Sequence, residues 1–149
     1  MPRIDIMGED VEFVCTTYTT TIYEQEFVND PFPKVTGDLI ADVYGMQKIR
    51  AEEILQMDEN GDVVIYRDYT KDNWQAVRRA LWAMVKTAML IRKKHGEEVG
   101  PIPSWRKWDE ATMEWQVDFR EVSDAVCNEG MRGLFRAGAA APETTSEEE

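Results

Sequence analysis

Few residues in this chain have the type and spacing that catalysis or metal binding requires. His95 is the only histidine, which excludes histidine-rich metal sites and catalytic triads that contain a histidine. It stands just before Gly96, at the end of an expected helix, where a cation complements the negative end of the helix dipole. We therefore interpret His95 as a structural residue.

Residues 58–62 (DENGD) begin like a calcium-binding loop but do not continue as one. Such a loop needs glycine at its sixth position and glutamate at its twelfth, and this chain has Val63 and Tyr69 there. Cys15 and Cys127 have no CxxC neighbour and are expected to be small buried side chains. No serine lies in a GxSxG context, and no phosphate-binding glycine loop is present. We expect no catalytic residue, metal site or cofactor.

The chain has 149 residues, of which 43% are hydrophobic, and a net charge of −12. This length and composition fit one folded domain with its own core. The negative charge disfavours nucleic acid and anionic membranes as partners. No apolar run reaches the ~18–20 residues that span a bilayer, and the first residues lack an apolar signal core. We expect a soluble, cytoplasmic protein.

The elements that would position a functional surface begin with a β-hairpin. Alternating apolar residues on either side of a turn at residues 8–10 predict two short strands. Residues 18–27 have helical spacing at Tyr18, Ile22, Tyr23 and Phe27, with Thr16 or Thr17 as the cap. Apolar positions also fit one helical face over 37–44, and the Asn60-Gly61 turn precedes an extended segment at 63–66.

A long helix from about residue 71 to His95 is the clearest element, because apolar residues recur along it at spacings of three and four. A short helix is expected after Ser104, and a last helix from Asp118 with Glu121 as its capping-box partner. The sequence thus predicts a mainly α (α+β) fold: one small helical domain, residues 1–136, with the N-terminal hairpin packed on the helices. Residues 137–149 are small, polar and acidic, and predict a disordered tail.

Two surface features could bind a partner. Residues 71–95 carry seven cations and one acid, and Arg79, Lys86 and Lys93 lie seven apart, on one side of a straight helix. Two interpretations are open: acidic neighbours such as Asp118, Glu121 and Asp124 cover this basic stripe, or it docks an acidic partner or a second copy of the chain.

The second feature is a tryptophan cluster. Trp105, Trp108 and Trp115 lie within eleven residues, close to Met113. Core packing explains about two of the three, and an exposed remainder would be typical of a binding hot spot. We predict a partner-binding role for these four residues and for the basic stripe.

The order of these elements resembles the small tail assembly chaperones of long-tailed, siphovirus-like bacteriophages, including members from prophages. The matching stretches are IDIMGEDVEF (4–13), IYEQEF (22–27), GDLI (37–40), DYTKDNW (68–74), ALWAM (80–84) and RGLFRAG (132–138). They cover most of residues 1–138 as a pattern.

The resemblance implies a mainly α, non-enzymatic assembly factor. Such a protein binds the tape-measure protein, keeps it soluble and helps to recruit tail-tube subunits during virion assembly. It works in the cytoplasm of the host cell, sometimes as a homo-oligomer, and is not part of the mature virion. Family members are often also made in a longer form by ribosomal frameshifting, so this chain would be the short form.

Two other classes remain open. An acidic regulatory protein that inhibits by mimicking nucleic acid should present carboxylates at phosphate-like spacing on one face, and the basic helix disfavours it unless that helix is buried. A small enzyme with a carboxylate-bound metal is disfavoured by the single histidine and the incomplete calcium loop.

Overall fold

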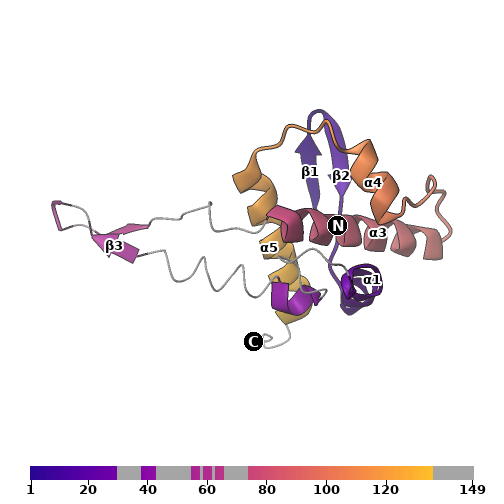
Figure 1. Cartoon of the computed structure of the whole chain (residues 1–149), viewed down its shortest axis with the longest axis horizontal. Coiled ribbons are helices and arrows are strands. Elements are labelled where there is room, and N and C mark those ends of the chain that lie inside the picture. Colours follow the sequence, from indigo (N-terminus) through magenta and orange to yellow (C-terminus); the bar gives the residue numbers. More distant parts are fainter. Residues whose placement is uncertain (30–37, 43–54, 58, 62, 66–73, 136–149) are drawn as a thin grey trace.

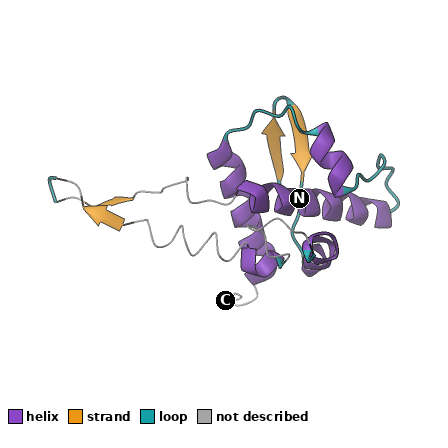
Figure 2. Ribbon diagram, in the orientation of Figure 1, coloured by secondary structure: helices purple, strands orange, loops and turns teal. Residues whose placement is uncertain are grey.

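The computed structural model describes residues 1–29, 38–42, 55–57, 59–61, 63–65 and 74–135. It confirms the predicted class: a mainly α domain with an antiparallel hairpin at the N-terminus. In Figure 1 the long helix α3 (Trp74–Lys94) lies at the centre, with the hairpin on one side of it and α1 (Thr17–Phe27) on the other. Helices α4 (Trp105–Ala111) and α5 (Phe119–Phe135) also contact α3 (Figure 2).

The hairpin joins β1 (Arg3–Ile6) to β2 (Glu9–Glu12), with Ile6 opposite Glu9. Its loop is Met7-Gly8, and both residues have positive φ, 55° and 87°. The expected turn at 8–10 was therefore placed too late, because Glu9 and Asp10 belong to the strand. A two-residue loop with positive φ at both positions matches the twist of the strands that it joins. The loop aims the buried Ile4 and Ile6 at the helices.

Helix α1 starts at the predicted place. Two threonines, Thr16 and Thr19, form the capping box at its N-terminus. The Thr16 hydroxyl accepts from the Tyr18 N–H (3.1 Å), and the Thr19 hydroxyl accepts from the Thr16 N–H (3.0 Å). Thr19 is buried, with its hydroxyl oxygen 2.8 Å from that of Thr87 on α3. The expected apolar face is wrong at Tyr18, whose side chain is 56% exposed.

Helix α3 forms the centre of the core, as its periodicity predicts, and ends at a glycine cap. Gly96 has φ +83°, and the Glu97 N–H donates to the Arg92 carbonyl (3.0 Å). Residues 66–73, which include the predicted start of this helix, lie outside the described part of the chain. The segment that follows β2 is hydrogen-bonded to this helix: the Val14 N–H donates to the Met84 carbonyl (3.2 Å).

Both C-terminal helices begin at the predicted caps. The Ser104 hydroxyl accepts from the Lys107 N–H (3.3 Å), and the Asp118 carboxylate accepts from the Arg120 N–H (3.0 Å). Val122 and Val126 of α5 are buried, whereas Phe119 and Ala125 are partly buried. The connection between α4 and α5 passes close to the hairpin loop, because the Gln116 N–H lies 3.1 Å from the Met7 sulfur.

The middle of the chain is described only in part. Residues 39–42 are helical, with Leu39 buried and Ile40 exposed. Strands β3 (Leu55–Met57) and β4 (Val63–Ile65) form a second antiparallel hairpin. The extended segment after Gly61 was predicted, but Leu55–Met57 was not recognised as its partner. The predictions for residues 43–44, for Tyr66 and for the tail 137–149 lie outside the described residues.

No helix among the described residues is long and apolar enough to cross a membrane.

Candidate functional site

A run of packed aromatic rings connects α1 to α4. Phe27 packs edge-on against Trp82 (5.7 Å between ring centroids) and Trp105 (5.4 Å). Trp105 stacks on Trp108 (5.8 Å, 29°), and Trp108 meets Trp115 edge-on (5.6 Å, 83°). The three tryptophans that the sequence singled out are therefore one cluster that begins in the core and ends at the surface.

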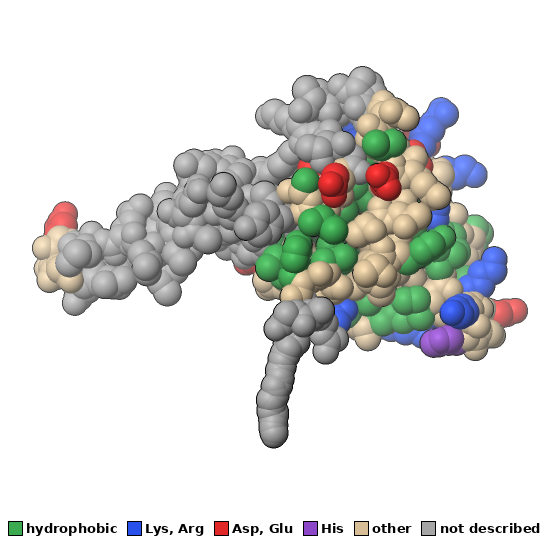
Figure 3. Space-filling model, turned by 90° about the horizontal axis from the view of Figure 1, so that it is seen from below, with side chains coloured by type: hydrophobic (Ala, Val, Ile, Leu, Met, Phe, Trp, Pro, Cys, Tyr) green, Lys and Arg blue, Asp and Glu red, His purple; other side chains and the backbone are tan. Residues whose placement is uncertain are grey.

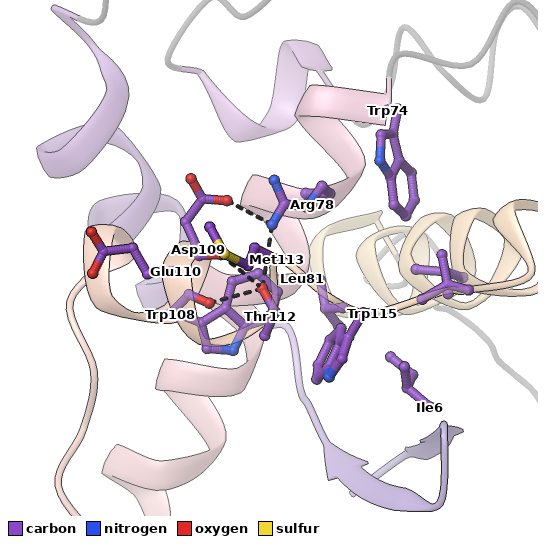
Figure 4. A pocket seen from close by; sticks show the side chains of 12 residues that line it. Ile6, Trp74, Arg78, Leu81, Trp108, Asp109, Glu110, Thr112, Met113 and Trp115 are labelled. Carbon is purple, nitrogen blue, oxygen red and sulfur yellow. Dashed lines mark hydrogen bonds and ion pairs between the residues drawn. The ribbon is translucent and has the colours of Figure 1, made fainter.

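The surface end of this run borders a pocket of about 330 Å³ between α3, α4, the start of α5 and the hairpin (Figure 4). We call it the aromatic pocket. Its lining residues are Ile6, Trp74, Arg78, Leu81, Trp108, Asp109, Glu110, Thr112, Met113, Trp115, Val117 and Val122.

Neighbouring aromatic rings fix the positions of two tryptophans, Trp74 and Trp115, in the walls of the aromatic pocket. Trp74, the first residue of α3, packs edge-on against Phe119 of α5 (5.0 Å). Trp115 is held against Trp108, whose side chain is only 7% exposed. Large flat rings fixed in this way form a preorganised apolar surface.

Polar groups inside the pocket bind one another. An Arg78 guanidinium nitrogen lies 2.6 Å from the Asp109 carboxylate and 3.3 Å from the Thr112 hydroxyl. The Thr112 hydroxyl in turn donates to the Trp108 carbonyl (2.8 Å). The guanidinium also lies over the rings of Trp105 (5.6 Å) and Trp108 (6.0 Å). The charge of Arg78 is thus balanced locally, and most of the remaining lining is apolar.

Met113 lines the pocket and is 71% exposed, more than any other large hydrophobic residue in the part of the chain that the structure describes. A methionine thioether adapts its shape to a partner surface, and exposed methionine is common where proteins bind apolar clients. The structure therefore brings Met113, Trp108 and Trp115 to one pocket, and their partner-binding role stays a prediction. Trp105 supports Trp108 from behind and does not line the pocket.

The three cations of the basic stripe do not form one surface. Arg79 is 6% exposed, with its guanidinium over the rings of Phe27 (4.8 Å) and Trp105 (5.5 Å). Lys86 is partly buried, its ammonium 5.3 Å from the Trp82 ring centre, and only Lys93 is exposed. On the face drawn in Figure 3, Lys and Arg side chains gather toward the side that carries the histidine. The prediction that these cations form one exposed docking stripe is therefore wrong, because aromatic rings cover Arg79.

The other candidates for chemistry are placed apart from the pocket. His95 is exposed at the end of α3. Cys15 and Cys127 are free and buried, as expected. Burial, with the nearby Glu129 carboxylate, raises the pKa of the Cys15 thiol from 9.0 to about 12. Among the residues that the structure describes, no three His, Cys, Asp or Glu side chains are arranged to hold a metal ion.

Sequence reasoning did not recognise Trp74, Arg78 and Ile6 as residues of the pocket. Trp74 was recognised only as part of the apolar stripe of α3, and Arg78 only as one cation among seven. Trp74 lies at the very start of its helix, where an aromatic residue has few neighbours in the core, and this position was a usable signal. No pattern in the sequence indicated that the hairpin residue Ile6 would complete the wall.

Comparison with protein-family models, curated proteins and solved structures finds no match for this chain.

Proposed function

We propose that this protein is a tail assembly chaperone that binds the tape-measure protein, keeps it soluble and helps to recruit tail-tube subunits. The observation that supports this proposal most is the aromatic pocket, with Met113 exposed at its edge and Trp74 and Trp115 in its walls. A chaperone of this kind needs fixed apolar surface for its client and no catalytic groups. The sequence resemblance supplies the identity of the client.

The size of the pocket supports a side chain as its occupant. Pockets for small molecules and cofactors span about 300–1,000 Å³, and this one lies at the lower limit with about 330 Å³. One or two large apolar side chains of a protein partner fill such a volume. Interface energy typically concentrates in a few aromatic anchors of this type.

The charge of the chain supports a role as a carrier of an apolar client. At a net charge of −12, copies of the protein repel one another. The same charge would keep a complex with an aggregation-prone client soluble. The proposed place of action is the host cytoplasm, and the chaperone leaves before the virion is complete.

Co-expression with the tape-measure protein of the same genome tests the proposal. We expect the tape-measure protein to be insoluble alone and soluble, in a complex that elutes as one peak, with the wild-type chain. The Met113→Glu variant should lose most of this effect, because it places a charge at the edge of the apolar site. A tape-measure protein that stays insoluble with the wild-type chain, with no complex eluting, would contradict the proposal.

Tyr18→Glu is the matched control. Tyr18 is also a large exposed side chain (56%), but it lies on α1 and does not line the pocket. Its replacement should leave the solubility of the client unchanged. An equal loss in both variants would mean that the pocket is not the client site.

A further inference from the structure

The aromatic pocket opens within a strongly acidic stretch of the surface. Residues 109–121 contain five acids and a single cation, Arg120. Four of these acids are exposed, namely Glu110, Glu114, Asp118 and Glu121. The carboxylate of the fifth, Asp109, pairs with Arg78 inside the pocket (2.6 Å). A partner that reaches the pocket therefore meets negative charge at its rim.

A second hollow, of about 190 Å³, continues the pocket toward the hairpin loop. The two hollows adjoin, because they share the lining residues Ile6, Val117 and Val122, and we refer to both together as the groove. Three carboxylates line its far part: Asp5 of β1, Asp118 before α5 and Glu121 in the first turn of α5. We call this part the acidic hollow.

Inside the aromatic pocket, Arg78 already takes two of the contacts that a partner's cation would use. Its guanidinium lies over the Trp108 ring and pairs with the Asp109 carboxylate. An apolar side chain suits the pocket, whereas a cation suits the acidic hollow and the exposed acids of the rim.

We propose that this groove binds a basic amphipathic helix of a partner protein, which places one large apolar side chain against Trp74 and Trp115 and lysines or arginines beside Asp118 and Glu121. This inference rests on the proposed function and names the kind of client segment that the site selects. Successive turns of a helix lie about 5.4 Å apart, so an apolar anchor and a cation three or four residues away reach neighbouring hollows. An acidic or uncharged helix lacks the second contact.

Calorimetric titration of the full chain with three synthetic peptides tests the choice of partner. The first probe is an amphipathic Leu/Lys peptide of about 18 residues, which is long enough to form a helix. The second is the same peptide with Glu in place of each Lys. The third has the same Leu/Lys composition in an order that gives no apolar helical face. The first should bind, and each of the others should bind at least about tenfold more weakly. Equal affinity for the Lys and Glu peptides would overturn the proposal.

Charge reversal locates the contact. The double variant Glu110→Lys/Glu121→Lys, at two exposed acids that line the groove, should weaken binding of the Leu/Lys peptide about tenfold. The control Glu26→Lys/Glu98→Lys changes the net charge equally at exposed acids on α1 and after α3, which do not line the groove, and should bind like the wild type. Equal weakening in both variants would mean that the peptide follows net charge alone, and the proposal would be wrong. Circular dichroism should give both variants the wild-type helix content.

The same variants separate this inference from the proposed function. If the tape-measure protein is kept soluble by the wild type and by Glu110→Lys/Glu121→Lys but not by Met113→Glu, the pocket binds the client and the basic-helix inference is wrong. If the wild type binds the Leu/Lys peptide as expected but leaves the tape-measure protein insoluble, the groove has the proposed selectivity and the chaperone function is wrong.

Discussion

The backbone N–H of Cys15 donates a hydrogen bond to the Glu129 carboxylate (2.8 Å), across 114 positions in the sequence. Glu129 is only 4% exposed, and it also pairs with Arg132 one turn further along α5. The bond fastens the segment that leaves the hairpin to the last helix. Because the hairpin and α5 both form walls of the aromatic pocket, this buried carboxylate supports the site from the opposite end of α5.

Replacing Glu129 by alanine should destabilise the fold by about 3 kcal/mol, because it leaves the buried Cys15 N–H without an acceptor and Arg132 without its partner. Glu129→Gln keeps an acceptor oxygen and should lose clearly less. Urea unfolding followed by circular dichroism measures both. Equal losses for the two variants would show that the hydrogen bond to Cys15 contributes little.

Gly133→Ala should destabilise the fold by about 2 kcal/mol, although alanine favours helices over glycine. A Cβ on Gly133 would lie 2.1 Å from the carbonyl oxygen of Cys15 and 2.7 Å from its carbonyl carbon. Helix α5 would therefore have to move away from the segment that follows β2. Gly100→Ala is the control, because nothing lies within 4 Å of its added Cβ. A Gly133→Ala protein as stable as the wild type would contradict this close approach.

The ion pairs of Arg92 should make stability depend on pH in the acid range. Hydrogen bonds from Arg92 lower the pKa of Glu12 below its ordinary value of 4.5, and Arg3 adds to the effect. The ionised Glu12 therefore stabilises the fold above pH 4.5, and this contribution is lost as the pH falls through the lowered folded-state pKa.

Glu12→Gln should accordingly cost about 1 kcal/mol near neutral pH and almost nothing well below pH 4.5. The measurement is the free energy of unfolding of both proteins across this range. Asp10→Asn, at an exposed acid that pairs with Arg3, should cost less free energy of unfolding near neutral pH than Glu12→Gln. Parallel curves for Glu12→Gln and the wild type would refute the role given to Glu12.

The sequence predicted the elements whose signals are local. The apolar stripe of α3 and the capping residues Thr16, Ser104 and Asp118 place their helices correctly, because periodicity and capping depend only on neighbours within a few residues. The fold class followed from these elements.

Features that depend on distant neighbours were not predictable. No local signal in the sequence showed that the backbone of Cys15 requires the absence of a side chain at Gly133. The sequence left open whether acidic neighbours cover Arg79 or whether it docks a partner. Its guanidinium instead lies over the rings of Phe27 and Trp105, because long cationic side chains also pack against apolar surface. The tryptophan cluster was found because its members are close in sequence, while Trp74 and Ile6 join it only through the fold.

Oxidative footprinting of Met113 in the complex with the tape-measure protein tests the central claim most directly. Dilute hydrogen peroxide converts exposed methionine to its sulfoxide, and mass spectrometry gives the rate at each position. Met1, 49% exposed and outside the pocket, is the internal reference. We predict that the client slows oxidation of Met113 about tenfold or more and leaves Met1 unchanged. Formation of the complex with an unchanged rate at Met113 would contradict client binding at the aromatic pocket.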